Sequence, residues 1–237
     1  MHRLSGICLL LLLLTVLAAC GGTSHPVKGY VSRPVSPVPV GGFDAYPPME
    51  INPKRSYSVI LTTDVGRATF SLFREEAPLA VNSVVFLAQE GFYDGLTFHR
   101  VLPGVLAETG DPTGTGNGGP GYTFEIEPPQ RPYERGVLAM ANSGAPNSNG
   151  SRFFIILGDV TTTNDLPGEY TVFGHIKEDH SPSARTLEKI EAVALGPAAN
   201  GEVSVPQEPI KLLELKANLG CATAGNQYGG GWAGGGC

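Results

Sequence analysis

The segment with the clearest chemical potential runs from Phe98 to Gly121. A single arginine, Arg100, stands in an apolar run typical of a strand, and a glycine-rich loop follows at Gly114–Gly121. The loop has no Gly-Lys-Ser/Thr ending and no helical pattern after it, so it does not predict nucleotide binding. A Gly-x-Ser-x-Gly elbow is also missing, so a Ser-His-Asp hydrolase is not indicated. What remains is a charged hydrogen-bond donor beside apolar strands.

Two further segments, Met140–Gly144 and Pro146–Phe154, follow later in the sequence. Each segment alone is weak evidence for any one protein family. Together with Phe98–Gly104, their order and spacing closely resemble the cyclophilin family of peptidyl-prolyl cis-trans isomerases. The resemblance covers the chain from about Tyr57 to Leu215.

This resemblance implies a reaction that needs neither a nucleophile nor a cofactor. Rotation about an Xaa-Pro bond is slow because resonance gives the C–N bond partial double-bond character. In the twisted transition state the prolyl nitrogen gains a lone pair, and a donor aimed at it lowers the barrier. The resemblance assigns this catalytic role to Arg100. Because isomerisation transfers no proton, His99 is expected to be structural rather than a general base.

The resemblance also implies a groove that binds the substrate. Leu106, Phe154 and Leu166 would hold the proline ring, with Val105 beside them, and the Gly114–Gly121 loop would line the pocket for the preceding residue. Main-chain groups of the Ala141–Asn142 strand would pair with the peptide. The full set of implied substrate-binding residues is Val105, Leu106, Glu108, Ala141, Asn142, Phe154, Leu166 and Tyr170.

Several of these positions depart from the family pattern. Val105 replaces an aromatic residue, Glu108 replaces the glutamine that steadies the arginine, Arg152 replaces another glutamine, and Tyr170 replaces a histidine. A carboxylate at Glu108 would hold the guanidinium firmly but partly neutralise it. Besides an active isomerase, the sequence therefore leaves open a proline-peptide-binding chaperone module with weakened turnover. A purely structural surface lipoprotein is the third alternative.

The elements that position these residues follow from apolar periodicity. Val81, Val84, Val85 and Ala88 form one apolar face of a helix predicted at Glu75–Glu90. A second helix is predicted to start near Ser181, with Pro182 suited to its first turn. Strands are predicted at Tyr57–Leu61, Ala68–Phe73, Leu96–Leu102, Val105–Glu108, Gly136–Met140, Phe153–Leu157, Thr171–Ile176 and Ile210–Leu215.

Many short strands separated by turn residues indicate a mainly β fold, either a closed antiparallel barrel or a sandwich. The resemblance selects a closed eight-stranded antiparallel barrel capped by two α-helices, as in cyclophilins. Side chains fill the interior of so small a barrel. The substrate groove is therefore expected on its outer surface.

Residues 1–20 have the pattern of a lipoprotein signal peptide. His2 and Arg3 precede an apolar run from Ile7 to Leu17, which is too short to span a bilayer. The run ends in a sequence that resembles the bacterial lipobox, so Cys20 is predicted to be lipidated after cleavage. The alternative is an ordinary signal peptide in which this cysteine occurs by chance. The prediction places the domain on the extracytoplasmic side of a bacterial membrane.

The rest of the chain divides into three parts. Residues 21–55 are rich in proline and glycine and are predicted to be an extended tether. The alternative is a disordered leader without a function. Residues 56–217 form the isomerase domain. Residues 218–237 form a glycine-rich tail with Cys221 and Cys237, a possible disulfide in an oxidising compartment.

The formal net charge of −6 gives no basic stripe for phosphates, so nucleic acid is not an expected partner. Two cysteines without a nearby histidine make an incomplete metal site, and we expect no metal and no cofactor. The expected partners are proline-containing polypeptide clients and the membrane, reached through the lipid on Cys20. A monomer is expected.

Overall fold

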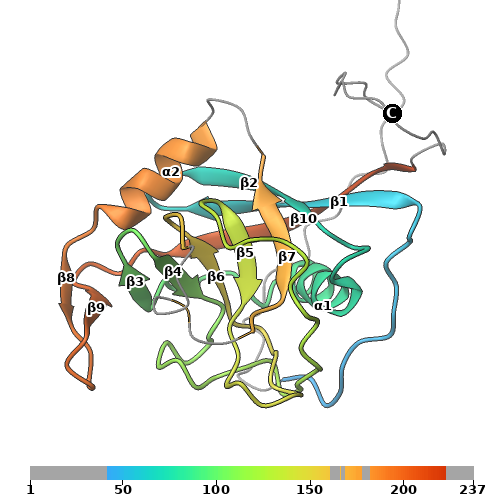
Figure 1. The fold of residues 1–237 in the computed structure, drawn as a ribbon, viewed down its shortest axis with the longest axis horizontal. Coiled ribbons are helices and arrows are strands. Elements are labelled where there is room, and N and C mark those ends of the chain that lie inside the picture. Colours follow the sequence, from blue (N-terminus) through green and yellow to red (C-terminus); the bar gives the residue numbers. More distant parts are fainter. Residues whose placement is uncertain (1–41, 161–165, 167–168, 178–181, 223–237) are drawn as a thin grey trace, which may run out of the picture. The chain divides into compact units, whose positions relative to one another are not determined.

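The computed structural model describes residues 42–160, 166, 169–177 and 182–222. In this part of the chain an eight-stranded antiparallel sheet is accompanied by two helices and a separate two-stranded hairpin (Figure 1). The order of strands across the sheet is β10-β1-β2-β7-β5-β6-β4-β3. Its strands are β1 (Arg55–Thr63), β2 (Arg67–Leu72), β3 (Arg100–Leu102), β4 (Leu106–Thr109), β5 (Val137–Met140), β6 (Phe153–Ile156), β7 (Val172–Ile176) and β10 (Leu212–Ala222).

The sheet is curled, but it does not close into a barrel. Its two edges are β10 and β3. Between these edges there is one isolated bridge among the described residues, Thr97 to Lys211. Backbone hydrogen bonds flank it, from the Phe98 N–H to the Ile210 carbonyl at 3.0 Å, from the Leu212 N–H to the Leu96 carbonyl at 2.7 Å and from the Gly95 N–H to the Leu212 carbonyl at 2.8 Å. Strand β3 is short, and no ladder pairs it with β10. The mainly β class and the eight strands agree with the prediction, but a closed barrel is not confirmed.

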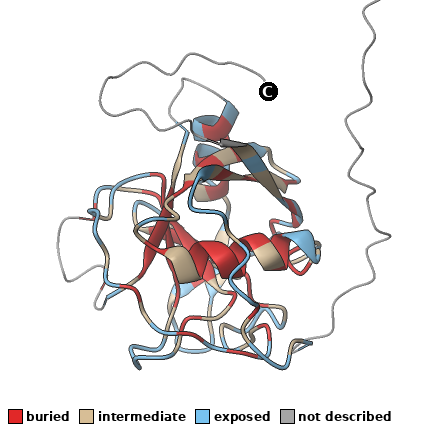
Figure 2. Cartoon of the chain, turned by 90° about the vertical axis from the view of Figure 1, so that its right-hand side faces the viewer, coloured by how far each residue is buried: buried red, intermediate tan, exposed pale blue. Residues whose placement is uncertain are grey.

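Helix α1 (Pro78–Gln89) is buried along most of its length (Figure 2). It begins at Pro78, later than predicted, and its N-cap residue Ala77 has no side chain that can cap it. Glu127 supplies the cap instead, because its carboxylate accepts hydrogen bonds from the Leu79 and Ala80 N–H groups at 2.8 and 2.9 Å. Free N–H groups at a helix start favour such an anionic acceptor.

Helix α2 (Pro182–Glu191) begins at the proline, as predicted. It buries Leu187 and Ile190, and it lies against β2. The Thr186 hydroxyl donates to the Arg67 carbonyl at 2.9 Å, which ties the helix to the end of that strand. No helix among the described residues is long and apolar enough to cross a bilayer.

Strand β6 separates two apolar clusters. All four of its residues are buried, and successive side chains point to opposite faces of the sheet. Phe153 and Ile155 enter the main core together with residues of α1, whereas Phe154 and Ile156 enter a second cluster on the other face. The second cluster gives this outer face an apolar floor, where a groove was expected.

Described residues on both sides of the predicted 56–217 domain are in contact with it. Residues 42–54, assigned to the tether, pack against α1: the Asn82 side chain accepts from the Glu50 and Ile51 N–H groups and donates to the Pro48 carbonyl. Residues 218–222, assigned to the tail, extend β10 and pair with the start of β1. Backbone pairing needs no apolar side chains, so a glycine-containing segment can add to the strand. Residues 1–41, including Cys20, lie outside the described residues, as do Cys237 and the side chain of Cys221.

Candidate active site

The pairing register of four strands places the central site residues in one row. Arg100 on β3 pairs with Glu108 on β4, Glu108 pairs with Phe154 on β6, and Phe154 pairs with Ala139 on β5. Directly opposed residues project on the same face of a sheet, with their β-carbons about 5 Å apart. The alternation that buries Val101 and Ala107 in the main core therefore directs Arg100 and Glu108 to the outer face.

This row opens into a cavity of about 240 Å³. All of the predicted site residues line it except Val105, which packs into the apolar cluster beneath. Arg152, which precedes β6, completes the wall. The lining residues are Arg100, Leu106, Glu108, Ala141, Asn142, Arg152, Phe154, Leu166 and Tyr170.

The apolar side of the cavity is firmly packed. Leu106, Phe154 and Leu166 are all buried. The Tyr170 ring meets Phe154 edge-on, with centroids 5.2 Å apart and planes at 83°. Tyr170 is fixed in turn by Tyr133, whose hydroxyl accepts from the Tyr170 N–H at 2.9 Å and donates to the Tyr170 carbonyl at 3.1 Å. A rigid apolar wall of this kind can hold a small aliphatic ring.

The charged side does not have the arrangement that the sequence suggested. Glu108 was expected to steady Arg100, but its nearer oxygen lies 3.9 Å from Arg100 Nη1. Glu108 instead accepts a hydrogen bond from Arg152 Nη1 at 3.1 Å. Arg100 is held by Glu202, which accepts from Nε at 2.8 Å and from Nη2 at 2.9 Å. The hydrogen bonds from Arg100 lower the pKa of Glu202 to about 2, and the same contact raises the pKa of Arg100.

Comparison with known proteins decides the family. The sequence model of the family described as "Cyclophilin type peptidyl-prolyl cis-trans isomerase/CLD" matches residues 58–217. The chain belongs to this family of enzymes. It is 43% identical over 140 residues to a peptidyl-prolyl cis-trans isomerase of Helicobacter pylori, a match that covers 58% of this chain and 82% of that protein. A relative from Synechococcus elongatus with the same description is 44% identical over 122 residues, covering 52% of this chain and 81% of its own.

Solved structures agree with the assignment. A cyclophilin-type isomerase of Cryptosporidium parvum matches with a TM-score of 0.59 and 32% identity, covering 69% of this chain and 98% of that one. Another structure of the same protein, determined in the presence of the dipeptide Ala-Pro, matches with a TM-score of 0.58 and 32% identity, over 68% of this chain and 98% of that one. The cyclophilin fold is therefore established for the described domain.

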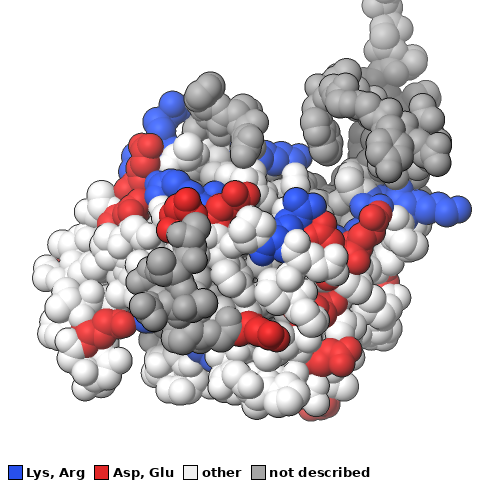
Figure 3. All heavy atoms as spheres, in the orientation of Figure 1, with Lys and Arg blue, Asp and Glu red and all other residues white. Residues whose placement is uncertain are grey.

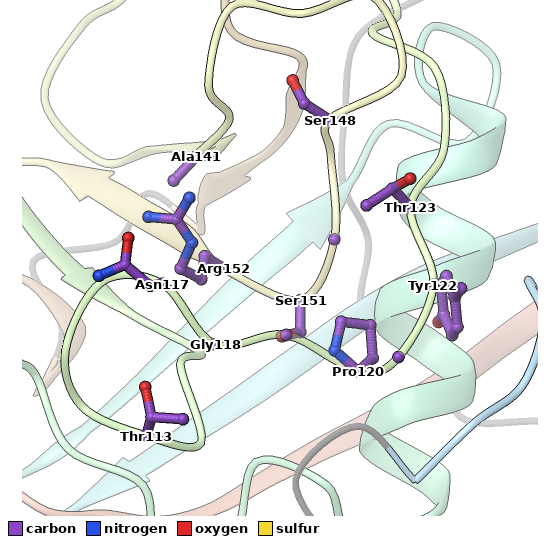
Figure 4. Close-up of a pocket in the computed structure, with 13 residues that line it drawn as sticks. Thr113, Asn117, Gly118, Pro120, Tyr122, Thr123, Ala141, Ser148, Ser151 and Arg152 are labelled. Atoms are coloured by element: carbon purple, nitrogen blue, oxygen red, sulfur yellow. The ribbon is translucent and has the colours of Figure 1, made fainter.

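A second cavity of about 580 Å³ adjoins the first in this cyclophilin domain and shares Ala141 and Arg152 with it. Figure 4 shows Arg152 projecting towards Asn117 and Ala141, while Pro120 and Tyr122 lie farther along. The Gly114–Gly121 loop supplies much of its wall, as predicted.

The loop keeps its shape because it folds around the buried Asp111 carboxylate. Asp111 accepts from the Thr113 N–H and hydroxyl at 2.7 Å each, and from the Gly116 N–H. A β-carbon at Gly118 would collide with the same carboxylate, so this position requires glycine. The Thr113 and Gly116 N–H groups therefore donate to a side chain of the protein itself and do not form a phosphate cradle.

His99 lies close to Gly116 of this loop and is partly buried, with its side chain 8% exposed. Its Nε2 is 3.5 Å from Glu108 Oε1, and neither ring nitrogen makes a hydrogen bond within the described part of the chain.

Among the described residues no three His, Cys, Asp or Glu side chains come together as metal ligands. On the face shown in Figure 3, acidic and basic side chains are interspersed and form no continuous basic stripe.

Glu202 is the site residue that sequence reasoning missed. It lies between β8 (Leu195–Pro197) and β9 (Val203–Pro206), a hairpin that was not predicted. The segment mixes proline, glycine and alanine without clear alternation, so it gives little strand signal. The Asn200-Gly201 pair was the available indication of a turn.

Proposed function

We propose that this cyclophilin isomerises Xaa-Pro bonds of exported proteins, outside the cytoplasmic membrane, to which a lipid on Cys20 attaches it. Arg100 is its catalytic donor. The apolar run before Cys20 and the lipobox-like sequence support the location. The family membership supports the reaction.

The observation that carries the mechanism is the position of Arg100 across one small cavity from Phe154 and Leu166. A substrate proline would place its ring on the apolar floor and its imide nitrogen towards the guanidinium. Nε and one Nη2 hydrogen are used by Glu202, so the Nη1 edge is the one that remains to donate.

As the imide twists, its nitrogen loses conjugation and becomes a hydrogen-bond acceptor. A charge-assisted hydrogen bond made only at that point contributes about 1.5–3 kcal/mol, which corresponds to roughly ten- to a hundredfold in rate. Burial of the proline ring among Leu106, Phe154 and Leu166 removes water from the reacting bond and strengthens that interaction. Tight packing around Tyr170 helps to hold the ring in place.

A protease-coupled assay tests the activity. Chymotrypsin cleaves an Ala-Pro peptide only in its trans form, so the slow phase reports isomerisation. The full chain should accelerate this phase, and Arg100→Ala should remove most of the acceleration. Decay curves that match the blank for both proteins would refute the enzymatic mechanism proposed here. Proline-dependent binding without acceleration would favour the binding-module alternative.

The location needs a separate test. Expression in a bacterium with radiolabelled palmitate should label the full chain and place it in the membrane fraction. Cys20→Ser should lose the label, while Cys221→Ser, the matched control, should keep it. A chain that remained labelled after Cys20→Ser would rule out this lipidation site.

A further inference from the structure

The contact between Arg100 and Glu202 is a two-point clamp on one edge of the guanidinium. Arg100 Nε and Nη2 donate to the two oxygens of one carboxylate, at 2.8 and 2.9 Å. The Arg100 and Glu202 side chains are 34% and 31% exposed. A paired geometry of this kind fixes the plane and direction of a guanidinium as well as its distance.

The hairpin that carries Glu202 is built to present it. At its turn the Ala198 N–H donates to the Glu202 carbonyl at 2.7 Å, and the Asn200 side chain accepts from the Glu202 N–H at 3.0 Å. Gly201 has a φ of +86°, a conformation that other residues rarely adopt. A hydrogen bond with the Ser204 side chain further lowers the pKa of the Glu202 carboxylate. Strand β9 contacts β3, which brings the turn to the edge where Arg100 stands (Figure 1).

Without this clamp Arg100 could pair with a second acidic residue, Glu108. Glu108 is its directly opposed partner in the β3–β4 ladder, and cross-strand ion pairs form readily at such positions. Pairing with Glu108 would engage the Nη1 edge, which lies 3.9 Å from that carboxylate. Glu202 holds the opposite edge of Arg100, and Arg152 holds Glu108. These two contacts together keep the Nη1 edge available to the cavity.

Stability alone does not account for the clamp. Ion pairs exposed to this degree contribute little to folding, because water already solvates both groups. An arginine side chain has many rotamers, however, and a catalytic donor that is slightly misplaced loses much of its effect. A guanidinium that is free to change rotamer would therefore lower the turnover rate rather than the free energy of unfolding.

We infer that Glu202 is a positioning residue for isomerisation, which holds the Arg100 guanidinium so that its Nη1 edge faces the proline cavity. This inference rests on the proposed function of Arg100. It makes the β8–β9 hairpin, outside the eight-stranded sheet, a part of the active site. The carboxylate itself does not touch the substrate.

The test compares Glu202→Gln with Glu208→Gln, which removes an exposed carboxylate from the same segment. Two-dimensional exchange NMR on a saturating Ala-Pro peptide gives turnover, and titration gives peptide affinity. Glu202→Gln should lower turnover about tenfold, with affinity changed less than about twofold. Glu208→Gln should behave as wild type. Glu202→Asp, which keeps the charge on a shorter side chain, should recover part of the turnover.

The Arg100 Nε–H resonance reports whether the clamp is intact, and the loss of turnover at unchanged peptide affinity is the readout that a merely structural role would not produce. This resonance should lie downfield in the wild type and in Glu208→Gln, and move upfield in Glu202→Gln. If Arg100→Ala is slow while Glu202→Gln keeps wild-type or higher turnover, the inference is overturned and the proposed function stands. If Arg100→Ala turns over as fast as wild type, the proposed function fails and the inference fails with it.

Discussion

Arg152 and Glu108 form an ion pair at 3.1 Å in the wall of the smaller cavity, and Arg152 also lines the larger cavity beside it. The pair satisfies a carboxylate that would otherwise face Arg100 directly. The resemblance to the family implies a glutamine at each of these positions, whereas this chain carries an ion pair there. We expect the two charges to compensate one another within the groove.

Arg152→Ala should lower turnover about fivefold, because the released Glu108 carboxylate would turn to Arg100 Nη1 and occupy the catalytic donor. In a Glu108→Gln background the same change should alter turnover by less than about twofold. Exchange NMR on all four proteins completes the cycle, with Arg67→Ala on β2 as a control for loss of an exposed positive charge. Equal effects of Arg152→Ala in both backgrounds would contradict the compensation.

Phe154→Leu should weaken peptide binding more than it slows turnover. Phe154 forms the floor of the cavity and stacks edge-on with Tyr170, but it does not approach the imide nitrogen in our account. We expect peptide affinity to fall about fivefold, at a stability cost of about 1–2 kcal/mol. Calorimetric titration and thermal unfolding measure the two quantities. A large loss of turnover at saturating peptide would show that the ring has a further role.

Asp111→Asn should destabilise the glycine-rich loop by about 2 kcal/mol, because an amide can accept on one side only. Burial raises the pKa of Asp111, but hydrogen bonds from Thr113 and the loop N–H groups outweigh it, so the pKa lies below its ordinary 3.8. A depressed pKa stabilises the fold at pH above the ordinary value, and this stability is lost as the pH falls through the depressed one.

Urea unfolding at several pH values checks the direction of this pH dependence. The difference between wild type and Asp111→Asn should be constant at neutral pH and shrink below 3.8. Asp159→Asn, at an exposed position, should differ little from wild type at any pH. A difference that grew towards acid would refute the assignment.

Asn82→Ala should detach residues 42–54 from α1. The side chain bonds to backbone groups of Pro48, Glu50 and Ile51, and all of these contacts would be lost. We expect a loss of about 2–3 kcal/mol in unfolding free energy, and new proteolytic cleavage before Arg55. Gln89→Ala, on an exposed position of the same helix, is the control. Unchanged cleavage would mean that other contacts hold the segment.

Much of the fold could be predicted because local pattern and burial agree. Phe153–Ile156 is a short, apolar, β-rich run, and the structure makes it a strand that is buried on both faces. The row of Arg100, Glu108 and Phe154 follows from this alternation, because each of them stands next to a core residue in the sequence. The family motifs then indicated which outward side chains share the groove, and all but Val105 line it.

The rest depends on contacts between residues far apart in the chain. Arg100 and Glu202 are 102 positions apart, and nothing local distinguishes Glu202 from the exposed Glu208. The approach of the two sheet edges likewise involves residues far apart in the chain, such as the bridged Thr97 and Lys211, which strand patterns do not predict. The segment 42–54 has no periodicity that predicts its packing against α1. Asn82, a polar residue buried in a largely apolar helix, is the sequence feature that indicates a hydrogen-bonding partner there.

The most direct test of the central claim is exchange NMR on an Ala-Pro peptide at saturation, comparing wild type with Arg100→Ala. We predict that turnover falls at least about tenfold, while peptide affinity stays within about threefold, because the guanidinium acts on the twisted imide and the apolar floor binds the ring. An exchange rate for Arg100→Ala equal to that of wild type would contradict it.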